Sequence, residues 1–377
     1  MYGNLINRVG THIINALIFY FLVFNLSVKG QKTEKSNQVI LGFHSYNGMI
    51  LPHDIAIEPV SHTNPRGFEF NFALHLMSED VWQYGFCYPR IGVAFHYVDF
   101  ANKDVVGSAF ALYPYIEPFI GAGRRVSWGF RLGAGLSYQT HIYDEANNPL
   151  NKFFGSHYAF IAMLNSSLNY KFSPKVSARF TASFNHISNG GTIRPNYGIN
   201  YPMIGLGVDY IFNPIEFEKR EKDRSIVLNE DKNRLDIALF YSGRKSQYFE
   251  EWYPVYGLWG GYSRMISRIN ALYAGGEIVS DILVRKTAEE AFRTGQIDEI
   301  PDHLRISLLA GHEFVLGRFI FSQYLGIYVY SPVEARDFWY QRYALLYQFM
   351  PKTWIGINIR SHLDIVDFID LRLTRSF

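Results

Sequence analysis

One stretch of the chain, residues 184–200 (FNHISNGGTIRPNYGIN), combines residue types that could carry out nucleophilic catalysis. His186 and Ser188 are two residues apart, so in a strand they project from the same face. A serine hydroxyl is a weak nucleophile, and an imidazole beside it can take its proton as it attacks a carbonyl carbon. Three residues follow, Asn189, Gly190 and Gly191. They could donate hydrogen bonds to the oxyanion of an ester intermediate. The chemistry that these types indicate is ester hydrolysis.

A simpler interpretation of the same stretch involves no catalysis. A histidine and a serine at a strand end can be ordinary residues of a membrane–water interface, and Ser-Asn-Gly-Gly is common turn chemistry. Against this, polar groups held beside hydrocarbon are costly and tend to be functional. Spacing alone leaves both interpretations open.

The segment that must position the pair, residues 176–188, alternates apolar and polar side chains. Because side chains alternate across a strand, the segment has one oily and one polar face. The oily row, which continues into the two candidate residues, is Val176, Ala178, Phe180, Ala182, Phe184, His186 and Ser188. If that face meets lipid, the pair is presented sideways to acyl chains.

The same alternation predicts about sixteen strands along the chain. They begin near residues 37, 67, 91, 106, 125, 158, 174, 202, 234, 255, 268, 304, 318, 338, 352 and 366. Their connections are alternately long (45–66, 141–157, 189–201, 282–303) and tight, a pattern typical of outer-membrane barrels. Two connections on the short side, 78–90 and 214–233, break this rule. The alternative is a soluble β-sandwich, whose strands would also alternate.

We therefore predict an all-β fold, a transmembrane antiparallel β-barrel. Two eight-stranded barrels and one barrel of about sixteen strands both fit the pattern. The expected domains are a first barrel region with the esterase motif (31–213), a charged periplasmic linker (214–233) and a second barrel region (234–377). The last strand ends at Phe377, and a terminal aromatic is typical of outer-membrane barrels, so we expect the barrel-assembly machinery to recognise it.

Composition narrows the class of protein further. Of 377 residues, 19% are charged and 17% aromatic, and a net charge of +2 gives no case for nucleic-acid binding. The single cysteine, Cys87, excludes an internal disulfide framework. Residues 1–30 have a basic start, an apolar middle and a small-residue end, which predicts a secretory signal peptide. The alternative for this segment is a single membrane anchor helix.

The stretch His186-x-Ser188-Asn189-x-Gly191, followed by Pro195-Asn196-x-Gly198, resembles the signature of the lipid A 3-O-deacylase (PagL) family. The resemblance covers roughly residues 37–213. It implies an eight-stranded barrel in the outer membrane of a Gram-negative bacterium. It also implies hydrolysis of an acyl ester of lipid A, the anchor of lipopolysaccharide. We expect neither a metal nor a cofactor. Ser188 would then be the nucleophile and His186 the base. Asn189 would belong to the oxyanion hole, with Gly190, Gly191 and Asn196 beside it.

Two departures from the family pattern stand out. The third member of the family's triad is a glutamate, and the matching position here is Asn200. An asparagine cannot stabilise an imidazolium by charge, but it can hold the ring in one tautomer. The family barrel would end near Phe212, whereas this chain continues to Phe377. These departures keep open a non-enzymatic porin, transport or structural barrel with a degenerate motif. A secreted lectin-like protein is a third reading.

Overall fold

The computed structural model describes residues 37–190, 193–222, 232–244, 251–333, 337–363 and 365–377. The signal peptide expected at residues 1–30 lies outside the described residues. Among the helices that the structure describes, none has the length and apolar character to cross a membrane.

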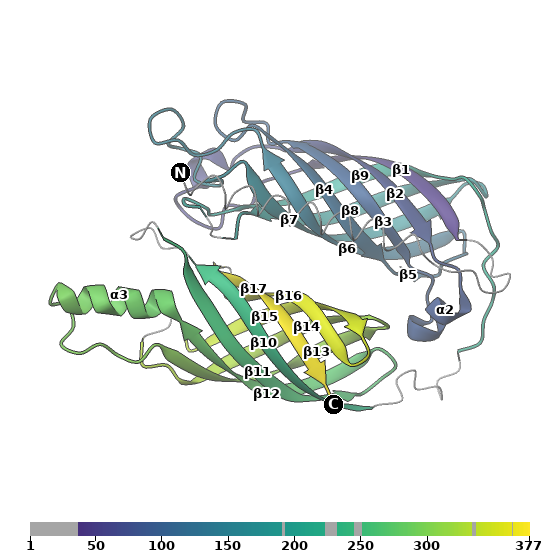
Figure 1. The fold of residues 1–377 in the computed structure, drawn as a ribbon. Coiled ribbons are helices and arrows are strands. Elements are labelled where there is room, and N and C mark those ends of the chain that lie inside the picture. Colours follow the sequence, from purple (N-terminus) through teal and green to yellow (C-terminus); the bar gives the residue numbers. More distant parts are fainter. Residues whose placement is uncertain (1–36, 191–192, 223–231, 245–250, 334–336, 364) are drawn as a thin grey trace, which may run out of the picture. The chain divides into compact units, whose positions relative to one another are not determined.

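The first half of the chain closes into an eight-stranded antiparallel barrel (Figure 1). Strand β1 pairs with both β2 and β9, so Phe43 lies between Phe70 and Val208, and β4 pairs with β6. The strands are β1 (Gln38–Gly48), β2 (Arg66–His75), β3 (Arg90–Asp99), β4 (Ser108–Glu117), β6 (Val126–Gln139), β7 (Tyr158–Lys171), β8 (Val176–Ser188) and β9 (Ile199–Ile211), with the two-residue β5 (Phe119–Ile120) beside β6.

The second half closes into a barrel of its own, in which β10 pairs with β11 and with β17 (Figure 1). Leu239 of β10 faces Leu373 of β17 across this closure. The strands are β10 (Asn233–Arg244), β11 (Tyr253–Met265), β12 (Asn270–Asp281), β13 (Leu304–Leu316), β14 (Phe319–Tyr330), β15 (Trp339–Met350), β16 (Thr353–His362) and β17 (Ile365–Ser376). Of the two architectures that the sequence allows, the structure has two barrels of eight strands.

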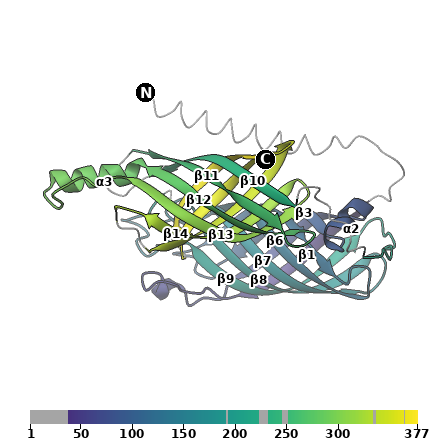
Figure 2. The same ribbon diagram turned by 90° about the horizontal axis from the view of Figure 1, so that it is seen from below.

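Within the part of the chain that the structure describes, three short helices lie in the connections. They are η1 (Glu58–Val60) between β1 and β2, α2 (Glu79–Gly85) between β2 and β3, and α3 (Ile282–Arg293) between β12 and β13. Helix α3 projects from one end of the second barrel (Figures 1 and 2). Its N-terminus is capped by Asp281, whose carboxylate accepts hydrogen bonds from the N–H groups of Leu283 and Val284.

The alternation of side chains places the oily rows on the outside of both barrels. In β9, Leu206 and Val208 are 68% and 52% exposed, whereas Asp209 of the same strand is fully buried in the lumen. In β17, Leu371 and Leu373 face outward and Arg372 faces inward. An apolar outer wall around a polar interior is the arrangement expected of a barrel in the hydrocarbon core of a lipid bilayer.

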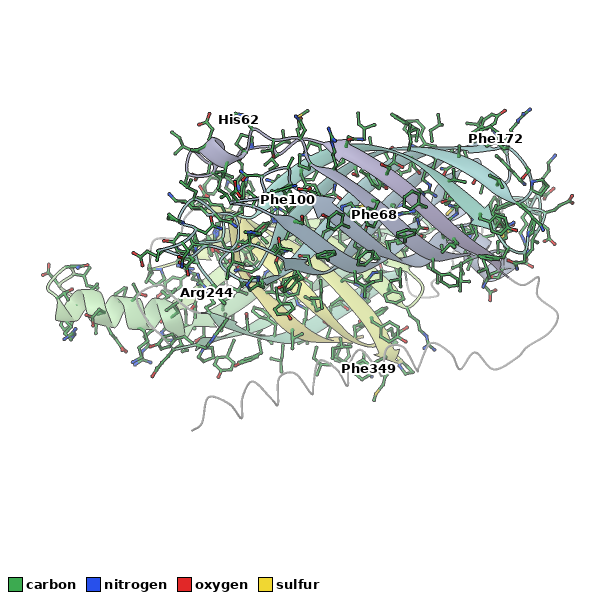
Figure 3. The ribbon with its side chains drawn as sticks, turned by 90° about the horizontal axis from the view of Figure 1, so that it is seen from above. His62, Phe68, Phe100, Phe172, Arg244 and Phe349 are labelled. Carbon is green, nitrogen blue, oxygen red and sulfur yellow. The ribbon has the colours of Figure 1, made fainter. Side chains whose placement is uncertain are left out.

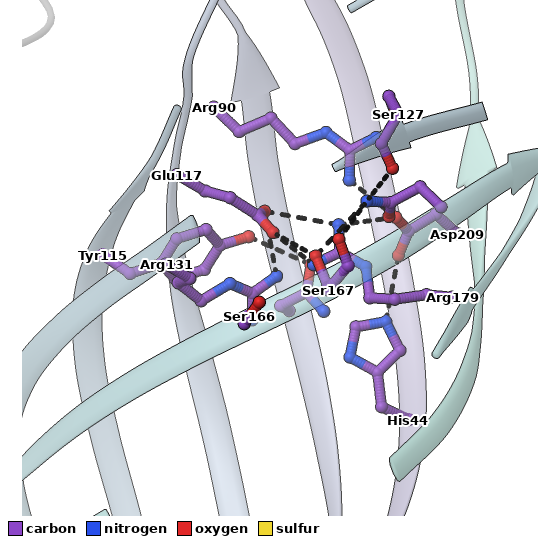
Figure 4. A network of polar contacts seen from close by, with 12 residues as sticks. His44, Arg90, Tyr115, Glu117, Ser127, Arg131, Ser166, Ser167, Arg179 and Asp209 are labelled. Carbon is purple, nitrogen blue, oxygen red and sulfur yellow. Dashed lines mark hydrogen bonds and ion pairs between the residues drawn. The ribbon is translucent and has the colours of Figure 1, made fainter. Parts of the chain in front are cut away.

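The lumen of the first barrel holds a charge-balanced network rather than an open channel (Figure 4). Arg131 bonds to Glu69 at 2.6 Å and lies 3.3 Å from Glu117, and Arg179 joins Glu117 to Asp209 at 2.5 and 3.0 Å. Asp209 also contacts Arg90 at 2.6 Å and His44 at 3.0 Å. Buried charges are tolerated only when they are paired in this way, and an eight-stranded barrel leaves room for side chains alone.

The second lumen is filled in the same manner. Arg342 contacts Glu277 at 2.7 Å and Asp370 at 2.5 Å, and all three side chains are fully buried. Arg372 lies over the ring of Trp259, with the guanidinium carbon 4.0 Å from the ring centroid. Such a packed interior is expected for eight strands.

In the first barrel the connections β1–β2, β3–β4, β6–β7 and β8–β9 meet at one end. His62 of the β1–β2 loop and Phe172 of the β7–β8 turn lie at opposite ends of this barrel (Figure 3). The long-loop end therefore assembles loops from all around the barrel, and β8 ends there with Ser188.

Part of the expected linker, residues 223–231, lies outside the described residues. Before it, the chain stays against the first barrel: Gln38 donates to the Ile215 carbonyl at 2.7 Å, and the Tyr88 hydroxyl to the Glu218 carbonyl at 3.3 Å. Its location in the periplasm stays a prediction, as does recognition of Phe377 by the assembly machinery.

Candidate active site

His186 and Ser188 lie on the outer face of β8, at its loop end. Phe180 and Phe184 of the same row are 48% and 43% exposed, while Asn185 on the opposite row is buried in the lumen. His186 and Ser188 continue the outer row and are half-buried. The pair is thus presented sideways from the barrel wall, as the alternation of the sequence predicts.

Asn200 stands directly opposite His186 on the neighbouring strand. The antiparallel register of β8 and β9 pairs these two residues, and His186 Nδ1 lies 2.6 Å from Asn200 Oδ1. An amide oxygen can only accept, so the proton of this bond belongs to Nδ1. In the neutral imidazole the other nitrogen, Nε2, then carries a lone pair. That is the tautomer a general base requires.

Gly198, a residue of the quoted signature, lies between the histidine and the serine. Its φ is +70°, a conformation that L side chains rarely adopt. A Cβ at this position would stand 3.0 Å from His186 Cε1, from Ser188 Cβ and from the Ile187 carbonyl oxygen. One methyl-sized position therefore touches both candidate catalytic side chains, and glycine is the residue that leaves it free.

The serine and the histidine are not yet bonded to each other. Within the described residues, no hydrogen bond joins Ser188 Oγ to His186 Nε2. Such bonds are often long or misaligned before substrate binds. Because both side chains border Gly198, a rotation of Ser188 about χ1 moves its hydroxyl relative to the imidazole edge without moving the backbone.

The turn after Ser188 is held by the side chain of Asn189. This side chain is buried, and its amide donates to the Ile193 carbonyl at 2.8 Å and to Ser156 Oγ at 3.2 Å. The Asn189 N–H donates to Asn196 Oδ1 at 3.0 Å. The structure thus directs both asparagines into bracing the turn. Gly190 follows with a φ of +66°, and Gly191 lies outside the described residues.

A second loop supports this turn from the side. In the β6–β7 connection, the carbonyl of Lys152 accepts from the Tyr197 N–H at 3.2 Å, and that of Phe153 from the Gly198 N–H at 3.1 Å. Phe153 is fully buried, which anchors its carbonyl against the interior of the barrel. Gly198 is therefore positioned by residues far away in sequence, and no signal near the motif indicates them.

A third loop reaches Asn200. In the β1–β2 connection, the Leu51 N–H donates to the Asn200 carbonyl at 2.8 Å. Two residues later, His53 places Nδ1 at 3.2 Å from Asn200 Nδ2 and Nε2 at 2.9 Å from the Tyr197 carbonyl oxygen. Sequence reasoning did not select His53, because it stands alone in a loop with no motif around it.

Asp209 does not belong to the site. It faces the lumen and binds Arg90, Arg179 and His44 there, on the other side of the barrel wall from His186. Of the described candidates, His186, Ser188 and Asn200 meet on the outer face, and Asn189 and Asn196 meet in the turn beside them.

Comparison with known proteins gives two family matches. The family model of the lipid A 3-O-deacylase (PagL) matches residues 66–209, and that of the acyloxyacyl hydrolase C-terminal domain matches residues 233–377. The second match covers the half of the chain that the resemblance in sequence left unexplained. No curated protein matches the chain.

Solved structures similar to this chain include other outer-membrane barrels. The outer membrane enzyme PagL is 14% identical, with 44% of this chain and 97% of that chain covered and a TM-score of 0.32. Neisserial surface protein A is 9% identical, with coverage of 46% and 97% and a TM-score of 0.32. The attachment invasion locus protein Ail of Yersinia pestis is 11% identical, with coverage of 47% and 100% and a TM-score of 0.29.

The fold and the family matches together identify an outer-membrane protein of a Gram-negative bacterium. The signature residues, 186–198, lie within the first match. Residues 66–209 are thus similar to the lipid A 3-O-deacylase (PagL) family, and the second barrel, residues 233–377, is similar to the acyloxyacyl hydrolase C-terminal domain.

Proposed function

We propose that this protein is a serine esterase that removes an ester-linked acyl chain from lipid A. The observation that carries the proposal is the 2.6 Å contact between His186 Nδ1 and Asn200 Oδ1 on the outer face of the barrel. It leaves the Nε2 of the imidazole as a base beside a serine, at a wall that faces lipid. The match to the family model supplies the substrate class.

In the proposed reaction, Ser188 Oγ attacks the carbonyl carbon of the acyl ester while His186 Nε2 takes the hydroxyl proton. The tetrahedral intermediate collapses, the bond to the sugar oxygen breaks, and His186 returns its proton to that oxygen. The acyl chain is then held as an ester of Ser188. Water, deprotonated by the same imidazole, attacks this ester and releases the fatty acid and the free serine.

The oxyanion needs hydrogen-bond donors in the turn after Ser188. Because the amide of Asn189 is bonded to Ile193 and Ser156, we assign to this side chain the task of shaping the turn. The backbone N–H of Gly190 is then the donor that the proposal places nearest to the reacting carbonyl. The role of Gly191 stays a prediction from the resemblance.

The test is the mass of lipid A from cells that express each form of the protein. Wild type should yield lipid A that has lost one acyl chain, and Ser188→Ala should not. Ser45→Ala is the matched control, because Ser45 also lies on the outer face of a strand of this barrel. If wild type and Ser188→Ala give the same acylation pattern as cells without the protein, the esterase proposal fails.

The structure gives less support to the alternative that the protein is a porin or transporter. A transport pore needs an open lumen, and both lumens here are crossed by buried ion pairs such as Arg179–Glu117 and Arg342–Glu277. Stable conductance in planar bilayers that does not depend on Ser188 would favour that alternative.

A further inference from the structure

We propose that His53 is a positioning residue that fixes the direction of the Asn200 amide and, through it, the tautomer of His186. The inference rests on the proposed function, which it deepens at the same site. It is built on a chain of contacts across three loops or strands: His186 Nδ1 to Asn200 Oδ1 at 2.6 Å, Asn200 Nδ2 to His53 Nδ1 at 3.2 Å, and His53 Nε2 to the Tyr197 carbonyl at 2.9 Å.

The proton positions along this chain follow from one fixed acceptor. The Tyr197 carbonyl oxygen can only accept, so His53 Nε2 carries a proton. In the neutral ring His53 Nδ1 is then an acceptor, and it can receive a hydrogen bond only from the NH₂ group of Asn200. The amide oxygen of Asn200 is thereby turned toward His186. Each contact in the chain requires the next.

Without His53, the amide of Asn200 has two directions to choose from. In the reversed direction the NH₂ group faces His186 Nδ1, which must then be the acceptor. The proton of the imidazole moves to Nε2, and the ring can no longer take the proton of Ser188. A misdirected tautomer of this kind is very damaging to triad enzymes.

This requirement is peculiar to an asparagine. A carboxylate presents two oxygens, both acceptors, so it holds Nδ1–H in either direction and needs no partner to orient it. The glutamate that the family resemblance expects at this position would be self-sufficient. His53 thus compensates for Asn200, and it lies outside residues 66–209, the part of the chain that the family model matches.

The geometry of the β1–β2 loop supports a dedicated contact. The loop is tied to β9 by the backbone bond from Leu51 to Asn200, two residues before His53. The imidazole of His53 therefore approaches Asn200 from a backbone that is already attached to the same residue. His62, in the same loop and also exposed, lies away from the site among Asn64, Arg66 and Lys103.

The first test measures how fast a fluorophosphonate probe labels Ser188 in the folded, full-length protein. This probe reacts with an activated serine whatever the natural substrate is. His53→Ala should slow labelling about 3- to 10-fold, the effect of losing one orienting hydrogen bond of about 1 kcal/mol. His53→Gln, which can accept from Asn200 and donate to Tyr197, should recover part of the rate. His62→Ala is the matched control and should label like wild type.

The decisive comparison is made in the Asn200→Glu background. There His53→Ala should change the labelling rate by less than about 2-fold, because a carboxylate needs no orienting partner. If His53→Ala slows labelling equally with Asn200 and with Asn200→Glu, His53 merely supports the loop and the inference is wrong. The same conclusion follows if His53→Ala labels like wild type.

A second measurement separates this inference from the proposed function. In ¹⁵N-histidine-labelled protein, wild-type His186 should be protonated at Nδ1, and His53→Ala should shift part of the population to the Nε2 form. This spectrum can be recorded even if Ser188 is never labelled and lipid A is never cleaved, results that would end the esterase proposal. An unchanged His186 tautomer in His53→Ala would end the inference about His53.

Discussion

Gly198 provides the most quantitative prediction of the site, through the substitution Gly198→Ala. The new Cβ would stand 3.0 Å from His186 Cε1, from Ser188 Cβ and from the Ile187 carbonyl. Ordinary contacts of a Cβ lie between 3.4 and 4 Å, so these neighbours must move by several tenths of an ångström. The alanine must also adopt a φ of +70°, which costs roughly 1–2 kcal/mol for an L residue.

The effect on catalysis should exceed the effect on stability. A misplacement of about 1 Å between reacting groups can cost about 100-fold in rate, and here both reacting side chains are displaced from the same point. We expect Gly198→Ala to lower the rate of deacylation roughly 10- to 100-fold, while the barrel still folds. Activity is measured as loss of the acyl chain from purified lipid A, and folding as the gel-mobility shift that heating causes in folded barrels.

Gly121→Ala is the matched control. Gly121 also has a positive φ, of +76°, but its Cβ would meet only ordinary contacts of 3.4 Å and more, at the opposite end of the barrel. It should carry a similar backbone cost and keep its activity. If Gly198→Ala deacylates as fast as Gly121→Ala, then Gly198 does not separate the two catalytic side chains as the structure indicates, and the assignment of the site fails.

Three further outcomes are expected. Asn200→Glu should raise the deacylation rate by roughly 10-fold, because a carboxylate stabilises the imidazolium that forms when His186 takes the proton. The rate is measured with purified lipid A, and an unchanged rate would contradict this expectation. Asp209→Asn should lower the free energy of unfolding, measured by urea titration, by roughly 3 kcal/mol, because it leaves buried arginines without a full negative partner. Activity per folded molecule should not change. A selective loss of activity would place Asp209 in the mechanism. Backbone N–H groups of Asn147 and Ala146 lower the pKa of Asp144 in the β6–β7 loop, so the stability that this turn contributes is present above the ordinary aspartate range and is lost as pH falls through the lowered pKa. Urea titrations from pH 7 to pH 3 should show a steeper decline for wild type than for Asp144→Asn, and parallel curves would contradict this.

The second barrel extends the family barrel without repeating its site. Its outer rows are as apolar as those of the first barrel, and its lumen is closed by pairs such as Arg342 with Asp370. This half matches the family model of the acyloxyacyl hydrolase C-terminal domain over residues 233–377.

Much of the fold could be predicted from the sequence because alternation is a local property. The sixteen expected segments correspond to the sixteen long strands among the described residues, each beginning within a few residues of the expected start. The outward direction of His186 and Ser188 followed from the same parity, since they are two and four residues beyond the exposed Phe184. Membership of Asn200 in the site followed from the resemblance, and strand register brings it opposite His186.

What decided the rest was pairing between segments that are far apart in sequence. Any two strands with alternating rows can pair, so the pattern by itself could not say whether β9 returns to β1 or continues the sheet into β10. The structure settles it through the pairing of β1 with β9, in which Phe43 lies opposite Val208. The same limit hid His53, which reaches Asn200 across 147 residues. Side-chain alternation depends only on residues that are adjacent in sequence. The closure of a barrel and the hydrogen-bond partner of an amide depend on which distant segments of the chain come within hydrogen-bond reach.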